Sequence, residues 1–351
     1  MIESDDWGSA RLPNIESQRE YLKTNHRAAN CPYLSYDCLE GDEDLEAIGN
    51  ILNEFSDHAG RPAKITANYN VTNPDYEKIG DADLQEYFYE PFTASLAREG
   101  RSKNGLEKMS ELISTGAWIP QSHGREHVNV ARWMSALRAS VPEITAAFNN
   151  RIYGVSLQCA PSIKQSLLAS FDCDTNTEFA TNAQILESGL KIFQEIFGFY
   201  SSTLIPPNYV LAPNILNLIP SHNVRGLQGL NLSKLPSSTA MQAKPRILGR
   251  EEARNVRSLV RNVQFEPSLG PSVDWVDRAL TETKKAFDLK KPAVICSHRI
   301  NFMGGIDKNN SLRGLKDLKT LLREILNRWP RVEFMSSDEL IRLISEAKYD
   351  R

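Results

Sequence analysis

The stretch that decides the fold is DEDLEAIGNILNEF at residues 42–55, followed closely by AKITANYNV at residues 63–71. In the first segment an acidic start precedes apolar residues that recur every three to four positions from Leu45 to Phe55. This period predicts an amphipathic helix. The second segment is short and rich in β-branched and aromatic residues, which predicts a strand. A helix followed by a strand is the repeating unit of an α/β fold.

The same alternation continues along the chain. Helical periodicity recurs at 186–197, ending at Gly198, and at 315–326, ending before Pro330. Further strands are predicted at 117–121, 199–205, 223–228, 292–297 and 331–335. We therefore expect a mostly parallel sheet with helices outside it, either a barrel or a doubly wound sheet. The segment 205–275 is rich in Pro, Asn and Ser and is interpreted as long loops over one face of the sheet.

Composition excludes several classes of protein. The chain has 351 residues, with 41 Lys and Arg against 44 Asp and Glu. This balance, without a basic block, argues against nucleic acid or an anionic membrane as partner. No apolar stretch reaches the roughly 20 residues of a transmembrane segment, and MIESDDWGS at the start has no signal-peptide pattern. Five cysteines without C-x-x-C spacing fit a reducing compartment. We expect a cytoplasmic protein.

Two adjacent acids are the first candidate site. Asp5 and Asp6 follow the short apolar start of the chain and precede Gly8. Where a strand ends in a glycine turn, neighbouring carboxylates can reach the same cleft and divide the work of metal ligand and base. The alternative is that they cap a helix or solvate a turn, as Asp commonly does.

Histidines supply the second and third candidates. His123 and His127 follow the predicted strand at 117–121, and Ser122 is interpreted as the N-cap of a helix that begins inside this motif. At positions i and i+4 the two imidazoles would share one helix face and one metal ion. His298 ends another apolar strand, where α/β folds place their sites. The alternative in each case is a surface, capping or locally satisfied histidine.

Asp with two His and an open coordination position is typical of catalytic zinc, and the same ligands suit non-haem Fe(II). A divalent ion lowers the pKa of its bound water toward about 7 and polarises a carbonyl, as amide or ester hydrolysis requires. A carboxylate outside the coordination sphere would take the proton of the water, and a separate His would protonate the leaving group.

These motifs, taken together, resemble those of the NodB-homology polysaccharide deacetylases (carbohydrate esterase family four). The resemblance spans nearly the whole chain, although about a hundred residues separate its first two motifs. It is carried in order by Ser4–Gly8 (SDDWG), by His123 and His127, by Pro206–Tyr209 (PPNY), by Ser297 and His298, and by the ending RVEFMSSDEL at 331–340.

The resemblance implies one domain over residues 1–351, a distorted (β/α)7 barrel with long insertions at about 10–115 and 230–275. It implies a metal-dependent hydrolase that removes acetyl groups from an N- or O-acetylated sugar or glycan precursor with one divalent metal ion, most often Zn²⁺. Asp5 would be the base, His298 the acid, and a backbone amide near Asn208 or Tyr209 would hold the oxyanion. The implied metal ligands are Asp6, His123 and His127, and the implied substrate-binding residues are Trp7, Asn208, Tyr209, Arg299 and Asn301.

Two departures from the family pattern mark a divergent member. Ile205 stands where the family carries an Arg before its Pro-containing loop, and the stretch 227–233 lacks the acid that tunes the catalytic His. We look for replacements of these two supporting groups among four residues, Glu266, Arg299, Asn301 and Asp307.

Two rival hypotheses remain open. His123–His127 also fits H-x-x-E-H, the inverted zinc-protease signature, with Glu126 as base. That motif belongs in a long helix, where Gly124 would cost about 1 kcal/mol. Such a protease would ignore Asp5 and Asp6, so alanine at these positions separates the two hypotheses. The other rival is a non-catalytic carbohydrate-binding descendant of the same fold. The sequence does not predict the oligomeric state.

Overall fold

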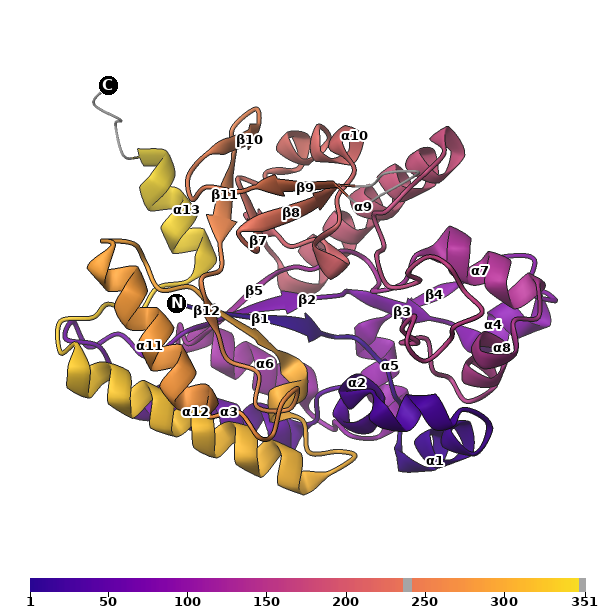
Figure 1. Ribbon diagram of the computed structural model, residues 1–351, viewed down its shortest axis with the longest axis horizontal. Helices are drawn as coiled ribbons and strands as arrows, with labels where there is room; N and C mark the ends of the chain where they lie inside the picture. The colour runs from indigo at the N-terminus through magenta and orange to yellow at the C-terminus, as the bar shows by residue number, and fades with distance from the viewer. Residues whose placement is uncertain (236–241, 347–351) are drawn as a thin grey trace.

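The computed structural model describes residues 1–235 and 242–346, and a parallel β-sheet lies at its centre (Figure 1). Within these residues nine strands follow the order β10-β11-β7-β6-β5-β2-β1-β13-β12. All neighbours pair in parallel except β10 with β11. The strands are β1 (Ile2–Trp7), β2 (Ile65–Tyr69), β5 (Trp118–Ser122), β6 (Thr203–Leu204), β7 (Gly226–Gly229), β10 (Glu251–Ala253), β11 (Val256–Val260), β12 (Val263–Gln264) and β13 (Ile295–His298). Two small hairpins add β3 (Thr72–Pro74) with β4 (Tyr89–Pro91) and β8 (Leu232–Leu235) with β9 (Gln242–Pro245).

The sheet closes on itself through one bent strand. β11 pairs with β7, and β12 pairs with β13, at the opposite end of the strand order. Only Arg261 and Asn262 separate β11 from β12 in the chain. Taken as one bent strand, β11–β12 completes a ring of seven strands with β1, β2, β5, β6, β7 and β13. The prediction of an α/β fold with a distorted seven-stranded barrel is confirmed.

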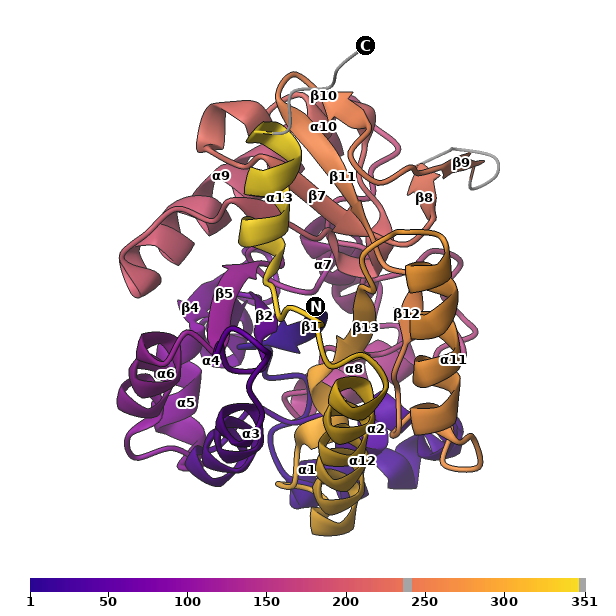
Figure 2. The same cartoon turned by 90° about the vertical axis from the view of Figure 1, so that its left-hand side faces the viewer.

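Helices cover the outside of the ring, and Figure 2 shows α3, α6, α11 and α12 around the strands. Apolar side chains of strands and helices form the main core between these layers, whose members include Ile2, Ile65, Leu322 and Phe334. The helices are α1 (Ile15–Thr24), α2 (Pro32–Tyr36), α3 (Asp42–Glu54), α4 (Tyr76–Asp81), α5 (Phe92–Glu99), α6 (Gly105–Ser114), α7 (Val130–Arg138), α8 (Pro142–Asn149), α9 (Asn176–Phe197), α10 (Pro213–Leu216), α11 (Trp275–Asp288), α12 (Lys308–Arg328) and α13 (Ser337–Glu346).

Most of the predicted elements are confirmed. The helices expected at 42–55, 186–197 and 315–326 are α3, α9 and α12, and Gly198 ends α9 with a left-handed φ of 78°. Four predicted strands correspond to β2, β5, β7 and β13, while the one predicted at 199–205 shrinks to the two residues of β6.

Two predictions about elements are wrong. The segment 331–335 is not a strand, because its amides bind partners other than a strand: the Phe334 amide donates to Asp57 Oδ2 and the Val332 amide to Trp329 O. The segment 205–275 is not simply loops, since it contains β7 to β12. Ser233, Pro245 and Ser258 lie within these short strands, and residues 236–241 lie outside the described part of the chain. Among the described residues no helix has the length and apolar character needed to span a membrane.

The inside of the ring is polar. Along β1, Ile2 joins the apolar core, whereas Glu3 and Asp5 are buried and bind Arg261. Asn68 on β2 and Gln228 on β7 exchange two hydrogen bonds of 2.9 Å across the ring. Buried polar groups need such partners, because an unpaired one costs free energy. The interior of the ring is therefore held together by buried hydrogen bonds and ion pairs.

Candidate active site

The acid pair lies at the carboxyl end of β1. A register shift against β2 between Ser4 and Trp7 breaks the regular ladder, and Asp6 takes a left-handed φ of 74°. A non-glycine residue in this conformation is strained, which is most often tolerated at functional positions. As a result both Asp5 and Asp6 line the same cavity, as the sequence predicts.

The two histidines come from a loop, not a helix. β5 ends at Ser122, residues 123–129 are irregular, and α7 begins at Val130 with Asn129 as its N-cap. The prediction that Ser122 caps a helix containing both histidines is therefore wrong. The physical reason is Gly124, whose φ of 89° turns the chain out of any helical path. The centroids of the two imidazole rings nevertheless lie 5.1 Å apart.

Three ligand atoms converge on one point. Nε2 of His123 and Nε2 of His127 each lie 3.3 Å from Asp6 Oδ1. Asp6 Oδ1 is buried and has no hydrogen-bond partner among the described residues. His123 Nδ1 lies 2.9 Å from the carbonyl oxygen of Ile205, a contact that orients the ring and leaves Nε2 toward Asp6. A buried carboxylate oxygen without a partner beside two imidazole nitrogens fits a divalent ion.

The electrostatics of Asp6 and His127 favour the same interpretation. Burial would raise the pKa of Asp6, but the guanidinium of Arg11 holds that pKa well below its usual range. Burial lowers the pKa of His127 to about 3. The carboxylate is thus ionised and the imidazole neutral, the protonation states in which these groups bind metals. Arg11 Nη2 lies 3.3 Å from Asp6 Oδ2, a contact that sequence reasoning missed because one arginine in a loop carries no signal.

Arg261 holds the second acid. Its Nη1 donates to Asp5 Oδ2 at 2.6 Å and its Nη2 to Asp5 Oδ1 at 2.7 Å, while Asn68 donates to Asp5 Oδ1 at 2.8 Å. Burial would raise the pKa of Asp5, but Arg261 lowers it to about 2. In the family pattern, the supporting arginine would stand at the position that Ile205 occupies in this chain. The replacement comes instead from the bend between β11 and β12, which only the folded chain brings to Asp5.

His298 is paired with Glu266. His298 Nδ1 lies 2.6 Å from Glu266 Oε1, and His298 Nε2 lies 3.8 Å from Asp5 Oδ2. Asn301 donates to Glu266 Oε2 at 2.8 Å. Burial would lower the pKa of His298, but Glu266 raises it well above its usual value. Of the four residues considered as replacements, Glu266 contacts His298 through its side chain, and Asn301 supports Glu266.

One cavity connects these groups at the carboxyl ends of the strands. It has a volume of about 760 Å³, and its lining includes Tyr33, Asn208 and Tyr209 besides the acids and histidines. Asn208 and Tyr209 have positive φ angles of 56° and 61° in the short helical turn η2 (Pro207–Tyr209). The Tyr209 amide donates to Pro206 O at 2.9 Å, so it is already engaged within the turn.

Three of the predicted substrate-binding residues are absent from the described lining of this cavity. Trp7 is fully buried against Trp118, because its indole belongs to the core and donates to Ser4. Arg299 is fully buried and donates to Asp37 and Glu40. Asn301 is fully buried behind His298.

The protease hypothesis finds no support in this geometry. Glu126 is buried, and Arg125 donates to it from Nε at 2.6 Å and from Nη2 at 3.0 Å. Thr72 donates to Glu126 Oε2 at 3.0 Å as well. Glu126 is absent from the described lining of the cavity, and the long helix that the motif requires is replaced by a loop.

No protein-family model matches the chain, and no curated protein sequence matches it. Among solved structures, a putative polysaccharide deacetylase from Mycobacterium smegmatis is similar over 98% of this chain and 90% of its own, with 11% identity and a TM-score of 0.45. A probable polysaccharide deacetylase from Pseudomonas aeruginosa PAO1 is similar over 99% and 91%, with 8% identity and a TM-score of 0.43. A 4-alpha-glucanotransferase from Thermococcus litoralis is similar over 97% of this chain at 8% identity and a TM-score of 0.43, and this chain spans only 39% of its length. Identities of this order concern the fold alone.

Proposed function

We propose that the protein is a metal-dependent hydrolase that removes acetyl groups from an N- or O-acetylated carbohydrate. One observation carries this proposal. A trio suited to a metal (Asp6, His123, His127), a carboxylate and a histidine line the same cavity. When bound by the trio, a divalent ion, most often zinc for such ligands, supplies Lewis acidity toward an acetyl carbonyl and toward water.

Asp5 is the proposed base. It is ionised at neutral pH, and Arg261 and Asn68 fix both of its oxygens at hydrogen-bond distance. A carboxylate held in this way does not need to reorient before it accepts the proton of the attacking water.

His298 is the proposed acid. Because Glu266 raises its pKa, the imidazole carries a proton at neutral pH, and Nε2 faces Asp5 at 3.8 Å. It can donate that proton to the leaving amine or alkoxide as the bond to the acyl carbon breaks. Asp5 and His298 thus border the same reacting centre from neighbouring strands, β1 and β13.

The amide of Asn208 is the proposed oxyanion donor. Pro206 and Pro207 restrict the backbone just before it, and the left-handed turn exposes this segment to the cavity. The Tyr209 amide is engaged by Pro206, so Asn208 is the donor of choice. Tyr33, Gln158 and Gln165 also line the cavity and offer an aromatic face and hydrogen-bonding groups to a sugar.

The test pairs metal content with acetate release. Purified protein should bind one equivalent of zinc and release acetate from N-acetylglucosamine oligomers or from an O-acetylated glycan. The double variant His123→Ala, His127→Ala should lose the metal. Asp5→Asn and His298→Ala should each keep the metal and lose about 10² to 10⁴ in rate. His26→Ala, which changes an exposed histidine away from the cavity, is the matched control.

Each failure has a distinct meaning. Stoichiometric zinc in the double variant would refute the metal trio. Zinc binding without acetate release from any substrate would favour a carbohydrate-binding descendant. A fully active Asp5→Asn together with an inactive Glu126→Gln would replace the deacetylase mechanism by the protease one.

A further inference from the structure

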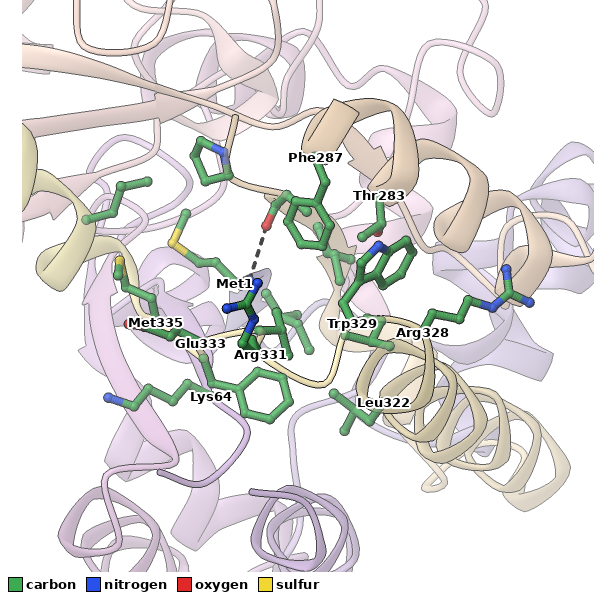
Figure 3. Close-up of a pocket in the computed structure, with 18 of the residues that line it drawn as sticks. Met1, Lys64, Thr283, Phe287, Leu322, Arg328, Trp329, Arg331, Glu333 and Met335 are labelled. Atoms are coloured by element: carbon green, nitrogen blue, oxygen red, sulfur yellow. Dashed lines mark hydrogen bonds between the residues drawn. The ribbon is translucent and has the colours of Figure 1, made fainter. Parts of the chain in front are cut away.

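A second cavity lies at the opposite end of the barrel, where the strands begin (Figure 3). Its volume is about 660 Å³, and its described lining shares no residue with that of the first cavity. The walls come from β1, α11, α12 and the segment 329–335. A volume of this size is within the range of small-molecule sites, roughly 300 to 1,000 Å³.

The walls are mainly apolar. Phe287 of α11 and Trp329 meet edge to face with ring centroids 5.1 Å apart. Leu322 and Ile325 of α12 and Phe334 complete this surface. Figure 3 shows the rings of Phe287 and Trp329 on the same side of the cavity. Such walls favour a ligand with an apolar body, because burial of its surface is the main source of affinity.

A buried hydroxyl in the wall lacks a partner. Thr283 of α11 is only 1% exposed, yet its Oγ1 forms no hydrogen bond within the described residues. Thr283 lines the cavity and lies beside Trp329 in Figure 3. A buried hydroxyl is normally hydrogen-bonded, so this one indicates room for an acceptor from outside the chain.

The rim of the cavity carries one cation that has no ion-pair partner among the described residues. Lys64, Arg328, Arg331 and Glu333 line the rim, but Lys64 is paired with Glu339 at 2.6 Å and Arg328 with Glu324 at 3.5 Å. Glu333 is bound by Arg61 outside the cavity at 2.9 Å. Arg331 is exposed and forms no ion pair within the part of the chain that the structure describes. Figure 3 labels Arg331 among the residues that line the cavity.

We propose that this cavity binds a medium-chain acyl carboxylate. The acyl chain contacts Phe287, Trp329 and Leu322, and the carboxylate accepts hydrogen bonds from Arg331. A planar guanidinium matches a carboxylate in a two-pronged geometry, which distinguishes an anionic head group from a neutral or cationic one. This site is independent of the metal trio and of the proposed hydrolase activity.

Titration calorimetry of the full chain with decanoate tests the proposal. Decanoate should bind at one site with a negative heat-capacity change, the mark of buried apolar surface. Arg331→Gln should weaken decanoate binding about tenfold and leave decanol binding unchanged, because only the charged head group contacts Arg331. Arg323→Gln, an exposed arginine on α12 outside the lining, is the matched control. Thr283→Met should weaken both ligands by filling the cavity.

Two further binding measurements test where the ligand binds and whether the site prefers a negative head group. Decanoate should bind the double variant His123→Ala, His127→Ala as it binds the original chain, and decyltrimethylammonium should bind much more weakly. The proposal is overturned if decanol or decyltrimethylammonium matches decanoate, if Arg331→Gln has no effect, or if the double variant loses binding.

Discussion

Arg261 is the only partner in the described structure that contacts both Glu3 and Asp5, two carboxylates buried inside the barrel. Its Nε donates to Glu3 at 2.6 Å, and its two terminal nitrogens donate to Asp5. Three buried charges in one cluster are stable only while each is paired. The same side chain therefore supports the barrel and orients the proposed base.

Replacing Arg261 by methionine should be strongly destabilising. The change leaves two buried carboxylates without their cation, and breaking a buried pair in this way typically costs about 3–5 kcal/mol. Arg261→Lys should recover part of this loss, because it restores the charge but not the planar fork. Urea unfolding of both variants measures the difference. A loss below about 1 kcal/mol in Arg261→Met would show that the cluster does not depend on this arginine.

Glu266 should control the pH dependence of the proposed reaction. Glu266 raises the pKa of His298, whereas burial of the imidazole lowers that pKa. In Glu266→Gln burial is opposed only by the weaker effects of Asp5 and Asp6, so the pKa of His298 falls and the acid loses its proton at lower pH. The alkaline limb of kcat/KM against pH should move to lower pH. Glu43→Gln, at an exposed position on α3, should leave the profile in place. An unmoved profile in Glu266→Gln would contradict the pairing.

At the scale of elements, the loop 123–129 shows where sequence periodicity fails. The i, i+4 spacing of His123 and His127 is typical of a helix, but the backbone of this segment bonds to the strands beside it. The His123 amide donates to Tyr69 O, and the Thr72 amide donates to Arg125 O. The proposed metal ligands could be named from their residue types and their order in the chain. Their backbone was not, because tertiary hydrogen bonds override the local pattern.

Gly124→Ala should separate backbone strain from damage to the site. An added Cβ at Gly124 would lie 3.2 Å from the Phe171 ring, in a backbone of φ 89° that side chains disfavour. We expect a loss of about 1–2 kcal/mol in stability, and weaker zinc binding because His123 and His127 flank the strained position. Gly60→Ala is the control, since its φ is 77° with no atom within 4 Å. It should cost similar stability and leave zinc affinity unchanged. Equal zinc affinity in both variants would contradict the proposal that the backbone at Gly124 positions His123 and His127 for the metal.

For the whole molecule, the order of motifs along the chain was enough to predict the barrel, the acid pair and the histidines at one end. The supporting residues were less accessible to sequence reasoning. Arg261 reaches Asp5 only because β11 bends into β12, and nothing in the local sequence marks that bend. Trp7 and Arg299 illustrate the converse: although they adjoin Asp6 and His298 in sequence, their side chains are buried and absent from the described lining of the cavity.

Zinc should stabilise the folded chain without being needed for folding. The apolar core clusters are formed by residues other than the three proposed ligands. The far-ultraviolet circular dichroism should therefore be unchanged by a chelator. Zinc at one hundred times its dissociation constant should add about 2.7 kcal/mol to the stability of the original chain and none to the double variant His123→Ala, His127→Ala. Calorimetry with and without zinc measures this. Unfolding on chelation would show that the ion is structural.

The position of β1 in the ring has a consequence for synthesis. β1 pairs in parallel with β2 on one side and with β13 on the other, and β13 lies near the opposite end of the described chain. A strand whose neighbour is so distant in sequence cannot complete its pairing until most of the chain has left the ribosome, and contacts of such long range slow folding. Asp5 and Asp6 are thus translated long before β13 and reach their final environment only after β13 has been made. Until Arg261 has been translated, Glu3 and Asp5 of β1 lack the cation that pairs with them. Two unpaired carboxylates disfavour early burial of this strand in a misassembled sheet.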